Sequence, residues 1–312
     1  MMYYPVHSGY PPYPEVNRAI EAVFAEHGRG DCRMPPKIYV ALVRSGDFRT
    51  MPAYLPKPGL AGVKIVNVNP HNRARGLPTV MALTVLIDVE TGAPEAIINA
   101  TELTAMRTGA AGAVAAKYLA PRQAITLGVI GAGRQTEALI DATVAALTVE
   151  EIRVWSRTAK SAEALASRYA DYSARSVSIE HACDCDVLTT ATPSTTPLVM
   201  AEWIHEGTHI NAIGADAPGK QELDPVLLQK AEVFVDDRSQ AIHSGEINVP
   251  ISTGRYNPDR IAGTLGEVVI GKKKRSSPDA ITIFDSTGLA IQDLAIAALA
   301  IQNSEGYELP FP

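Results

Sequence analysis

The chain has 312 residues, 46% of them hydrophobic and 20% charged, which predicts a sizeable core and two domains. The formal net charge is −6 and the longest basic run is Lys272–Arg275, so we expect no nucleic-acid partner. The sequence has no uninterrupted apolar stretch of about 18 residues, and residues 1–13 lack the basic start and apolar run of a signal peptide. We therefore expect a cytoplasmic protein that does not enter a membrane.

The cysteines do not form a recognisable metal motif. There are three, Cys32, Cys183 and Cys185, and an odd count argues against a disulfide framework and for a reducing compartment. The spacing of Cys183 and Cys185 is not that of a zinc pair, and His181 supplies at best a third ligand. We predict buried or loop thiols here and no metal site.

The first third of the chain predicts an α+β unit. Val16, Ile20, Val23 and Phe24 recur at helical spacing, which predicts a helix over 14–24. Strand-like runs follow, separated by turn signals, and consecutive hairpins of this kind predict an antiparallel or mixed sheet. The runs are 38–43, 62–68, 80–88 and 96–99.

The pattern changes at the small-residue stretch 104–117, which predicts a helix leading into a second domain. Beyond it, near-continuous apolar strands alternate with helices, as is typical of a parallel sheet buried on both faces. A last helix over 289–302 is expected to pack back on the first domain. The predicted strands are 124–130, 152–155, 187–190, 210–213, 233–235 and 281–284, and the predicted helices are 135–147 and 159–169.

A glycine motif follows the strand that ends at Ile130. Gly131 permits a tight turn, Gly133 lets backbone N–H groups approach a pyrophosphate, and the helix that begins there supplies free N–H donors. Thr136 stands where the pattern has Gly or Ala, and we expect it to loosen the packing of helix on strand. The succession of strand, glycine turn and helix predicts dinucleotide binding rather than a bare turn. The predicted cofactor-binding residues here are Gly131, Gly133, Arg134 and Gln135.

The second strand of this domain leads into Ser156, Arg157 and Thr158. An NAD-selective site has Asp or Glu at this point, whereas Arg with small hydroxyl groups suits a 2′-phosphate. We therefore favour NADP over NAD, with the alternative that Arg157 stacks on the adenine and leaves the choice open. Thr190 and Thr192, at the end of a later strand, are predicted to lie near the nicotinamide.

Motifs over nearly the whole chain support a family resemblance. They are Arg33–Pro35, Met51–Tyr54, Gly62–Lys64, Thr104–Ala110, Gly131–Gln135, Gly214–Leu223 and Asp285–Ala290. In this order they resemble the ornithine cyclodeaminase/mu-crystallin family, which includes archaeal-type alanine dehydrogenases and ketimine reductases. The resemblance implies an α/β protein that forms homodimers. A Rossmann-type parallel-sheet domain would span 116–288, and a discontinuous α+β domain for substrate binding and dimerisation would combine 1–115 with 289–312.

The resemblance also implies the reacting groups. Interconverting an amino acid and its 2-oxo acid or imine requires a clamp for the carboxylate and a group that handles protons. Arg33, Lys64 and Arg107 match the family's carboxylate clamp, and Lys64 can also donate a proton. Asp216 matches the family's acid/base aspartate. Thr287 and Gly288 are expected to approach the cofactor or substrate by their backbone.

Each charged candidate also has a structural interpretation. Arg33 can be a surface loop residue, Lys64 can lay its stem over apolar surface, and Arg107 can lie on a solvated helix face. For Lys220 and Glu222 we expect a local ion pair rather than a chemical role.

The residues before the Met-Pro motif bear on the reaction. Ornithine cyclodeaminases carry an acidic residue there, but 49–52 reads Arg-Thr-Met-Pro. We therefore predict an NAD(P)-dependent dehydrogenase or imine reductase that acts on an amino acid, a 2-oxo acid or a cyclic imine. The alternatives are an ornithine cyclodeaminase that forms proline with catalytic NAD, and a non-catalytic protein of the mu-crystallin type that binds NADPH or a small molecule.

Overall fold

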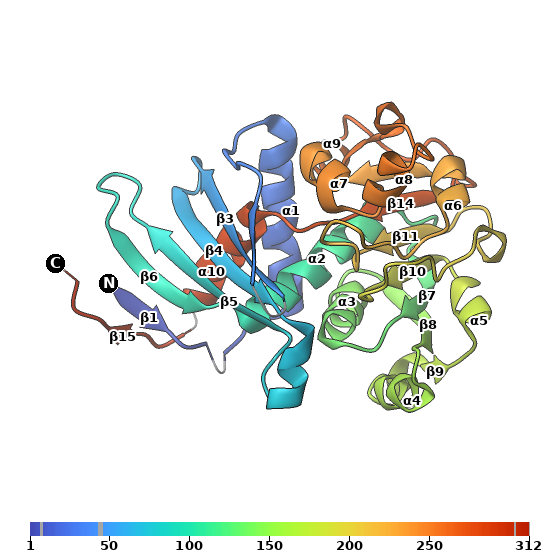
Figure 1. Ribbon diagram of the computed structural model, residues 1–312, viewed down its shortest axis with the longest axis horizontal. Coiled ribbons are helices and arrows are strands. Elements are labelled where there is room, and N and C mark those ends of the chain that lie inside the picture. The colour runs from blue at the N-terminus through green and yellow to red at the C-terminus, as the bar shows by residue number, and fades with distance from the viewer. Residues whose placement is uncertain (7–8, 43–45, 303, 312) are drawn as a thin grey trace. The chain divides into compact units, whose positions relative to one another are not determined.

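The computed structural model describes residues 1–6, 9–42, 46–302 and 304–311 (Figure 1). The chain divides into two compact units, the first made of Met1–Arg107 with Leu289–Pro312 and the second of Thr108–Gly288. The chain passes from the first unit to the second within helix α2 (Thr101–Leu119), and it returns to the first unit just before helix α10 (Ala290–Ile301). That the first unit binds substrate and forms a dimer, and that the second binds a dinucleotide, stays a prediction.

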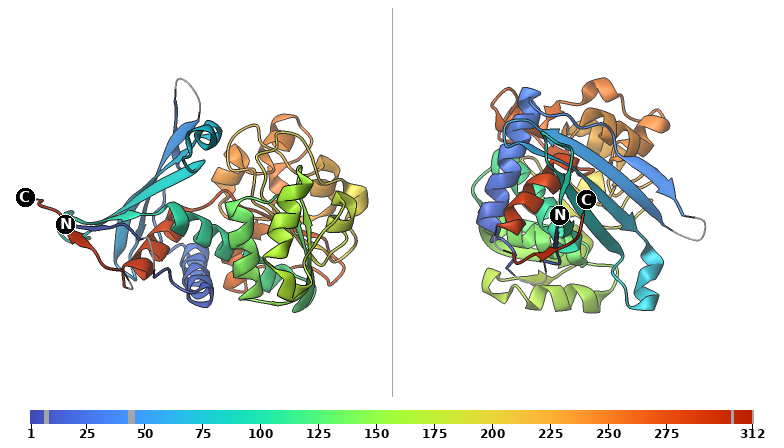
Figure 2. Two further views of the ribbon diagram at one scale, coloured as in Figure 1. Left: turned by 90° about the horizontal axis from the view of Figure 1, so that it is seen from below. Right: turned by 90° about the vertical axis from the view of Figure 1, so that its left-hand side faces the viewer.

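The first unit is built on a mixed sheet with the strand order β15-β1-β6-β5-β4-β3-β2. Neighbours from β2 to β6 are antiparallel and β1 runs parallel to β6, so the predicted antiparallel or mixed sheet is confirmed. Strand β15 pairs with β1, which brings the two ends of the chain to one edge of this sheet (Figure 2). The strands are β1 (Met2–Tyr4), β2 (Ile38–Ala41), β3 (Asp47–Leu55), β4 (Leu60–Val68), β5 (Val80–Ile87), β6 (Pro94–Asn99) and β15 (Tyr307–Glu308).

Helices α1 (Tyr13–Arg29) and α10 cover one face of this sheet. Helix α10 packs on α1 and on the central strands β3, β4 and β5, so the last helix returns to the first unit as predicted. Gly62 on β4 makes the close approach possible, because a Cβ there would lie 3.1 Å from Leu294 Cδ2 and 2.1 Å from the Val85 carbonyl oxygen. The 3₁₀ helix η1 (Pro70–Arg75) connects β4 to β5.

Strand β3 is an addition that the sequence pattern did not indicate. Polar residues and Pro52 obscure its alternation, yet Arg49, Met51, Ala53 and Leu55 are all buried on the helix-covered face. Strand β2 pairs only with the first residues of β3, so Pro52 lies where β3 has lost that neighbour, and proline is tolerated at such an edge. The predicted strand 38–43 is observed as β2, and its Val43 lies outside the described residues.

The second unit is built on a parallel sheet with the order β13-β12-β14-β11-β10-β7-β8-β9. Every pairing in it is parallel, and β10, β11 and β14 are buried along their whole length, so the predicted sheet buried on both faces is confirmed. The strands are β7 (Ala124–Ile130), β8 (Thr148–Trp155), β9 (Arg175–Ser176), β10 (Val187–Thr190), β11 (His209–Ala212), β12 (Glu232–Val235), β13 (Gly263–Thr264) and β14 (Thr282–Asp285).

Short helices connect these strands, and the carboxyl ends of the strands lie at one edge of the sheet. None of the helices in the described residues is both long enough and apolar enough to cross a membrane. The α-helices of this unit after α2 are α3 (Arg134–Val144), α4 (Ala159–Ser167), α5 (Ile179–Cys183), α6 (Pro225–Lys230), α7 (Arg238–Ser244), α8 (Asn248–Ser252) and α9 (Leu265–Val269). The 3₁₀ helices are η2 (Ala170–Tyr172), η3 (Ala201–Trp203) and η4 (Pro258–Arg260).

Candidate functional site

The glycine turn of the second unit joins β7 to α3. Gly131 has φ +119°, and a Cβ there would lie 3.0 Å from the Ala191 carbonyl oxygen and 3.2 Å from Thr136 Oγ1, so the turn requires glycine. Gly133 caps α3 in an extended conformation, and a Cβ there would meet no atom within 4 Å. Thr136 is fully buried against the turn, so it fills the space between helix and strand where we expected looser packing.

Two polar atoms at this turn lack partners. Gln135 Oε1 and Thr136 Oγ1 are buried, and neither forms a hydrogen bond within the described part of the chain. Buried polar atoms are normally satisfied, so such atoms at a helix N-terminus are suited to a polar ligand. Arg134, predicted beside them, forms an ion pair with Glu137, with 2.7 Å between Nη1 and Oε2.

The end of β8 lies beside the glycine turn, because the N–H of Gly131 donates to the carbonyl of Trp155 at 2.9 Å. Ser156 follows half-buried, and Arg157 and Thr158 are exposed. No carboxylate stands at this strand end, as the sequence indicated.

Thr190 and Thr192 are both bound to Glu222. Thr190 Oγ1 donates to Glu222 Oε2 at 2.7 Å, and the Thr192 N–H donates to Oε1 at 2.7 Å. The predicted ion pair between Lys220 and Glu222 is wrong. Glu222 is fully buried, whereas Lys220 is partly exposed and its ammonium binds Asp216 instead. Burial raises the pKa of Glu222.

Asp216 lies in the loop after β11, on the carboxyl side of the parallel sheet. Its side chain is partly exposed, and Lys220 Nζ binds both its Oδ1 and, at 3.4 Å, the Gly214 carbonyl oxygen. A carboxylate held this way stays near solvent with a fixed cation beside it.

Thr287 and Gly288, which follow β14, use their N–H groups within the protein. Both N–H groups donate to Asp236 Oδ2 at 2.7 Å. These two donors are therefore not available to a ligand, and the expected approach by the backbone is limited to other atoms of the two residues.

In the first unit, Lys64 and Arg107 meet at a residue that the sequence did not single out. Lys64 Nζ lies 2.7 Å from Asp293 Oδ1, and Arg107 Nε lies 2.9 Å from the same oxygen. Arg107 Nη1 also donates to Gln292 Oε1 at 3.2 Å. Lys64 is 1% exposed and Arg107 6%, so neither the exposed-stem nor the solvated-face interpretation holds. The sequence signal for Asp293 was a charge inside an otherwise apolar helix.

We call Lys64 and Arg107 the cation pair, and we include in its charge the Asp293 carboxylate that both of them bind. With Lys64 protonated, two cations face one carboxylate, so the group carries one net positive charge. Burial and the charge of Arg107 lower the pKa of Lys64 to about 7. The Lys64 amine can therefore gain or lose a proton near neutral pH.

Unpartnered polar atoms surround the cation pair. Asp293 Oδ2, Gln292 Nε2 and Thr84 Oγ1 are buried, and within the described residues none of them forms a hydrogen bond. Thr84 is the cross-strand neighbour of Lys64 on β5. Buried donors and acceptors that stay unpaired cost free energy. Gln292 Nε2 and Thr84 Oγ1 can donate to an anionic ligand beside the two cations, whereas Asp293 Oδ2 needs a donor such as an amine. The group therefore suits a ligand that carries both a carboxylate and a nitrogen donor.

Arg33, the third predicted member of the clamp, is separate. It is exposed, and its backbone bridges to Tyr54 with N···O distances of 2.9 and 2.8 Å. It lines a cavity of about 300 Å³ together with Cys32 and Lys57. The described residues show no bond from Arg33 to the cation pair, so the surface-loop interpretation describes its place in this structure.

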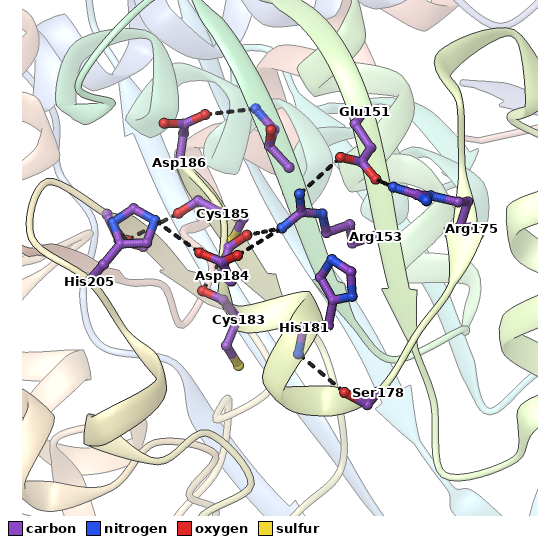
Figure 3. A network of polar contacts seen from close by, with 12 residues as sticks. Glu151, Arg153, Arg175, Ser178, His181, Cys183, Asp184, Cys185, Asp186 and His205 are labelled. Atoms are coloured by element: carbon purple, nitrogen blue, oxygen red, sulfur yellow. Dashed lines mark hydrogen bonds and ion pairs between the residues drawn. The ribbon is translucent and has the colours of Figure 1, made fainter.

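Cys183 and Cys185 lie in a structural network at the amino side of the parallel sheet (Figure 3). Arg153 links Glu151 to the carbonyl group of Asp184, and Asp186 accepts the Thr126 N–H at 2.8 Å. Both thiols are buried, as expected, and burial raises the pKa of Cys183 to about 12. Across the described part of the chain, no three His, Cys, Asp or Glu side chains form a group that could hold a metal ion.

Comparison with known proteins identifies the family. The model of the ornithine cyclodeaminase/mu-crystallin family matches residues 13–307. This chain belongs to that family. The alanine dehydrogenase of Archaeoglobus fulgidus is 48% identical over 293 residues, which cover 93% of this chain and 90% of the relative.

Solved structures of relatives superimpose on nearly the whole chain. An archaeal alanine dehydrogenase dimer with bound NAD is 43% identical, with a TM-score of 0.94 and 99% of both chains covered. The Δ1-pyrroline-2-carboxylate reductase of Thermococcus litoralis, in complex with NADH and L-proline, is 33% identical, with a TM-score of 0.92 and 97% of both chains covered. These relatives confirm the predicted fold class, a Rossmann-type domain with a second α+β domain.

Proposed function

We propose that this chain is an NAD(P)-dependent oxidoreductase that interconverts an L-amino acid and its 2-oxo acid or imine, with hydride transfer between the substrate α-carbon and the nicotinamide. The observation that carries the proposal is the cation pair: Lys64 and Arg107 are buried at one carboxylate, with unpartnered polar atoms around them. The relatives named above act on alanine or on a cyclic imino acid, each with one carboxylate.

The net charge of the cation pair indicates how the substrate is held. One buried positive charge is matched by one substrate carboxylate, and Arg107 retains N–H groups beyond those that bind Asp293 and Gln292. With a pKa of about 7, Lys64 can pass a proton to or from the substrate nitrogen or a water molecule. Asp216, fixed by Lys220, is the second group proposed for proton transfer.

The residues of the glycine turn fit a dinucleotide. The N-terminal N–H groups of α3 would hold the pyrophosphate, and Gly133 leaves space for it. The unpartnered Thr136 hydroxyl can donate to a phosphate oxygen, and Gln135 Oε1 can accept from a ligand hydroxyl. When bound, the nicotinamide accepts or donates the hydride.

Arg49 argues against a cyclodeaminase. This residue is 4% exposed and its Nε and Nη2 bind the two oxygens of Asp47 at 2.7 and 3.3 Å. An ion pair between Arg49 and Asp47 therefore stands where a cyclodeaminase has an acidic residue, so no unpaired carboxylate is offered to the second amino group of a diamino acid.

For the cofactor we propose NADP over NAD, on the exposed Arg157 between two hydroxyl side chains. The Arg157→Ala variant is expected to weaken NADPH binding about 10-fold, because a charge-assisted contact to the 2′-phosphate is lost, and to leave NADH binding within about twofold. Fluorescence titration with both reduced cofactors measures this. An equal loss for both would mean that Arg157 stacks on the adenine, and the preference would then be wrong.

A homodimer is proposed from the uncovered face of the first unit's sheet. Ile38, Thr50, Ile65 and Leu83 form one row across β2, β3, β4 and β5, and the three apolar members are 60%, 41% and 44% exposed. An apolar row of this kind is suited to a second copy of the chain, and the archaeal alanine dehydrogenase named above is a dimer. Light scattering measures the mass in solution, and a monomer would contradict the proposal.

Turnover assays test the function itself. The protein is incubated with NADH or NADPH, ammonia and pyruvate, or with a cyclic imine such as piperideine-2-carboxylate, and the absorbance of the reduced nicotinamide is followed. A steady loss of absorbance with either substrate is expected. Cofactor binding without turnover of any acid or imine would favour a binding protein and contradict the proposal.

A further inference from the structure

Buried acidic residues gather at the carboxyl ends of the strands in the second unit. Glu222, Asp236, Glu246 and Asp285 are all 0% exposed. Each accepts hydrogen bonds from backbone N–H groups of another segment. They therefore tie together the loops that follow the strands, which is where ligands bind in open α/β sheets.

Hydrogen bonds connect three of these residues in a series, in which each carboxyl group accepts backbone N–H groups from the segment that carries the next. Asp285, at the end of β14, accepts the N–H groups of Glu246 at 2.9 Å and of Ile247 at 3.3 Å. Glu246 accepts the N–H groups of Glu222 at 2.9 Å and of Leu223 at 2.7 Å. Glu222 then accepts those of Thr192 and Gly214. The series therefore runs from β14 to the loops that follow β10 and β11.

Glu222 is the member that reaches Asp216. The N–H of Thr192 binds Oε1 at 2.7 Å, and the N–H of Gly214 binds Oε2 at 2.8 Å. Gly214 begins the loop that carries Asp216, and Glu222 ends it, so this contact closes the loop. The approach is tight, because a Cβ on Gly214 would lie 2.5 Å from Glu222 Oε2.

A carboxyl group satisfies both donors, whereas an amide side chain does not. The two N–H groups bind different oxygens, and an amide side chain offers one oxygen and one NH₂ donor. The arrangement is costly, because in the described residues neither Glu222 nor Glu246 forms an ion pair. Burial and the neighbouring Glu222 raise the pKa of Glu246. Burying Glu222 costs free energy, and its hydrogen bonds require a specific geometry. Because it closes the loop that carries Asp216, the proposed proton-transfer group, these features point to a role in catalysis.

We propose that Glu222 is a positioning residue: it fixes the loop that places Asp216 for proton transfer, and it is itself held by Glu246. The proposal rests on the role of Asp216 in the proposed function. Lys220, in the same loop, holds the Asp216 side chain, and Glu222 holds the backbone on which both stand.

The Glu222→Gln variant tests this, with Asp186→Asn as the matched control. Asp186 is also a buried carboxylate that accepts a backbone N–H, but it lies at the opposite, amino side of the sheet and also binds the exposed Arg122 at 2.8 Å. We expect Glu222→Gln to lower kcat per cofactor-binding site about 10-fold to 100-fold, since small misplacements of reacting groups have effects of this size. The KM for the acid substrate and the Kd for NADH are expected to change less than about twofold. In Asp186→Asn the thermal midpoint falls and kcat per site is unchanged.

A second measurement does not depend on turnover. The N–H groups of Thr192 and Gly214 are expected to exchange with solvent deuterium faster in Glu222→Gln than in the wild type. In Asp186→Asn the same two N–H groups are expected to exchange at the wild-type rates. Should Glu222→Gln fail to fold, Glu246→Gln takes its place in both measurements, because it releases the backbone of Glu222.

The outcomes separate the proposal from the proposed function. Unchanged exchange at these two N–H groups, or an unchanged kcat, overturns the positioning role. Asp216→Asn is assayed alongside: if it keeps wild-type turnover, the acid/base role of Asp216 is wrong. If Asp216→Asn is inactive and Glu222→Gln is normal, only the positioning proposal fails.

Discussion

The two units both bury charged side chains, but they satisfy them in different ways. In the first unit Lys64 and Arg107 share a single carboxylate, and polar atoms around them lack partners. In the second unit Glu222 and Glu246 carry no ion pair in the described residues, yet backbone N–H groups satisfy their oxygens. The first arrangement is incomplete without a ligand and the second is complete without one.

This difference separates a binding role from a structural one more clearly than burial does. All of these side chains are buried, so exposure alone ranks them equally. Counting the unused donors and acceptors ranks them differently, because an unmade hydrogen bond in the interior costs more than a made one contributes. The cation pair is therefore the candidate substrate site, and the buried glutamates form a support for their loops.

Lys64→Met is expected to have the largest effect. The side chain is buried and of similar length, so the fold is retained, but the cation pair loses its net positive charge. We expect kcat/KM for the acid substrate to fall about 100-fold or more, consistent with about 3 kcal/mol for a buried charged contact. Steady-state kinetics measures it.

Lys57→Met is the control for this variant. Lys57 lies in the same unit, is 59% exposed and pairs with Asp31 Oδ2 at 2.6 Å. Exposed pairs of this kind contribute little, so activity is expected to stay near that of the wild type. A similar loss in both variants would mean that the cation pair has no special role.

Asp293→Asn tests the difference between the two units through the free energy of unfolding. It leaves Lys64 and Arg107 buried together without a carboxylate, and breaking a buried ion pair on one side costs about 3 kcal/mol. Glu246→Gln breaks no ion pair and is expected to cost less. Urea unfolding of both variants gives the two free energies of unfolding, and equal losses would remove the distinction between the units.

Much of the fold could be predicted because its strands and helices have strong periodicity. The strand 124–130 and its glycine turn were placed correctly, since Gly131 occupies a backbone conformation that other residues rarely adopt. Strand β3 was missed because its buried face includes Arg49, and a buried charge breaks the alternation on which the prediction depends.

The candidate site was only partly predictable for a related reason. Lys64 and Arg107 were singled out by motif, but Asp293 lies far along the chain and meets them only when α10 packs on β4. The predicted ion-pair partner of Lys220 was wrong, because spacing along the sequence does not tell which of two nearby carboxylates points into the core. Glu222 does so, and Asp216 stays at the surface.

The pH dependence of substrate binding is the smallest effect and the most specific to the cation pair. Burial and Arg107 lower the pKa of Lys64 to about 7, so the ammonium is present below this pH and is lost as the pH rises through it. The net charge of the group then falls from positive to neutral. We expect KM for the acid substrate to rise several-fold between about pH 6 and pH 8.

Lys64→Arg is the matched variant for this prediction, because a guanidinium stays protonated over the whole range. Its KM is expected to be independent of pH between the same limits, even where its absolute value is higher than that of the wild type. Steady-state kinetics over the pH range measures both. If the wild type and Lys64→Arg show the same rise, another group titrates. The incomplete charge balance of the first unit would then have no influence on binding, and the contrast with the satisfied glutamates of the second unit would lose its functional meaning.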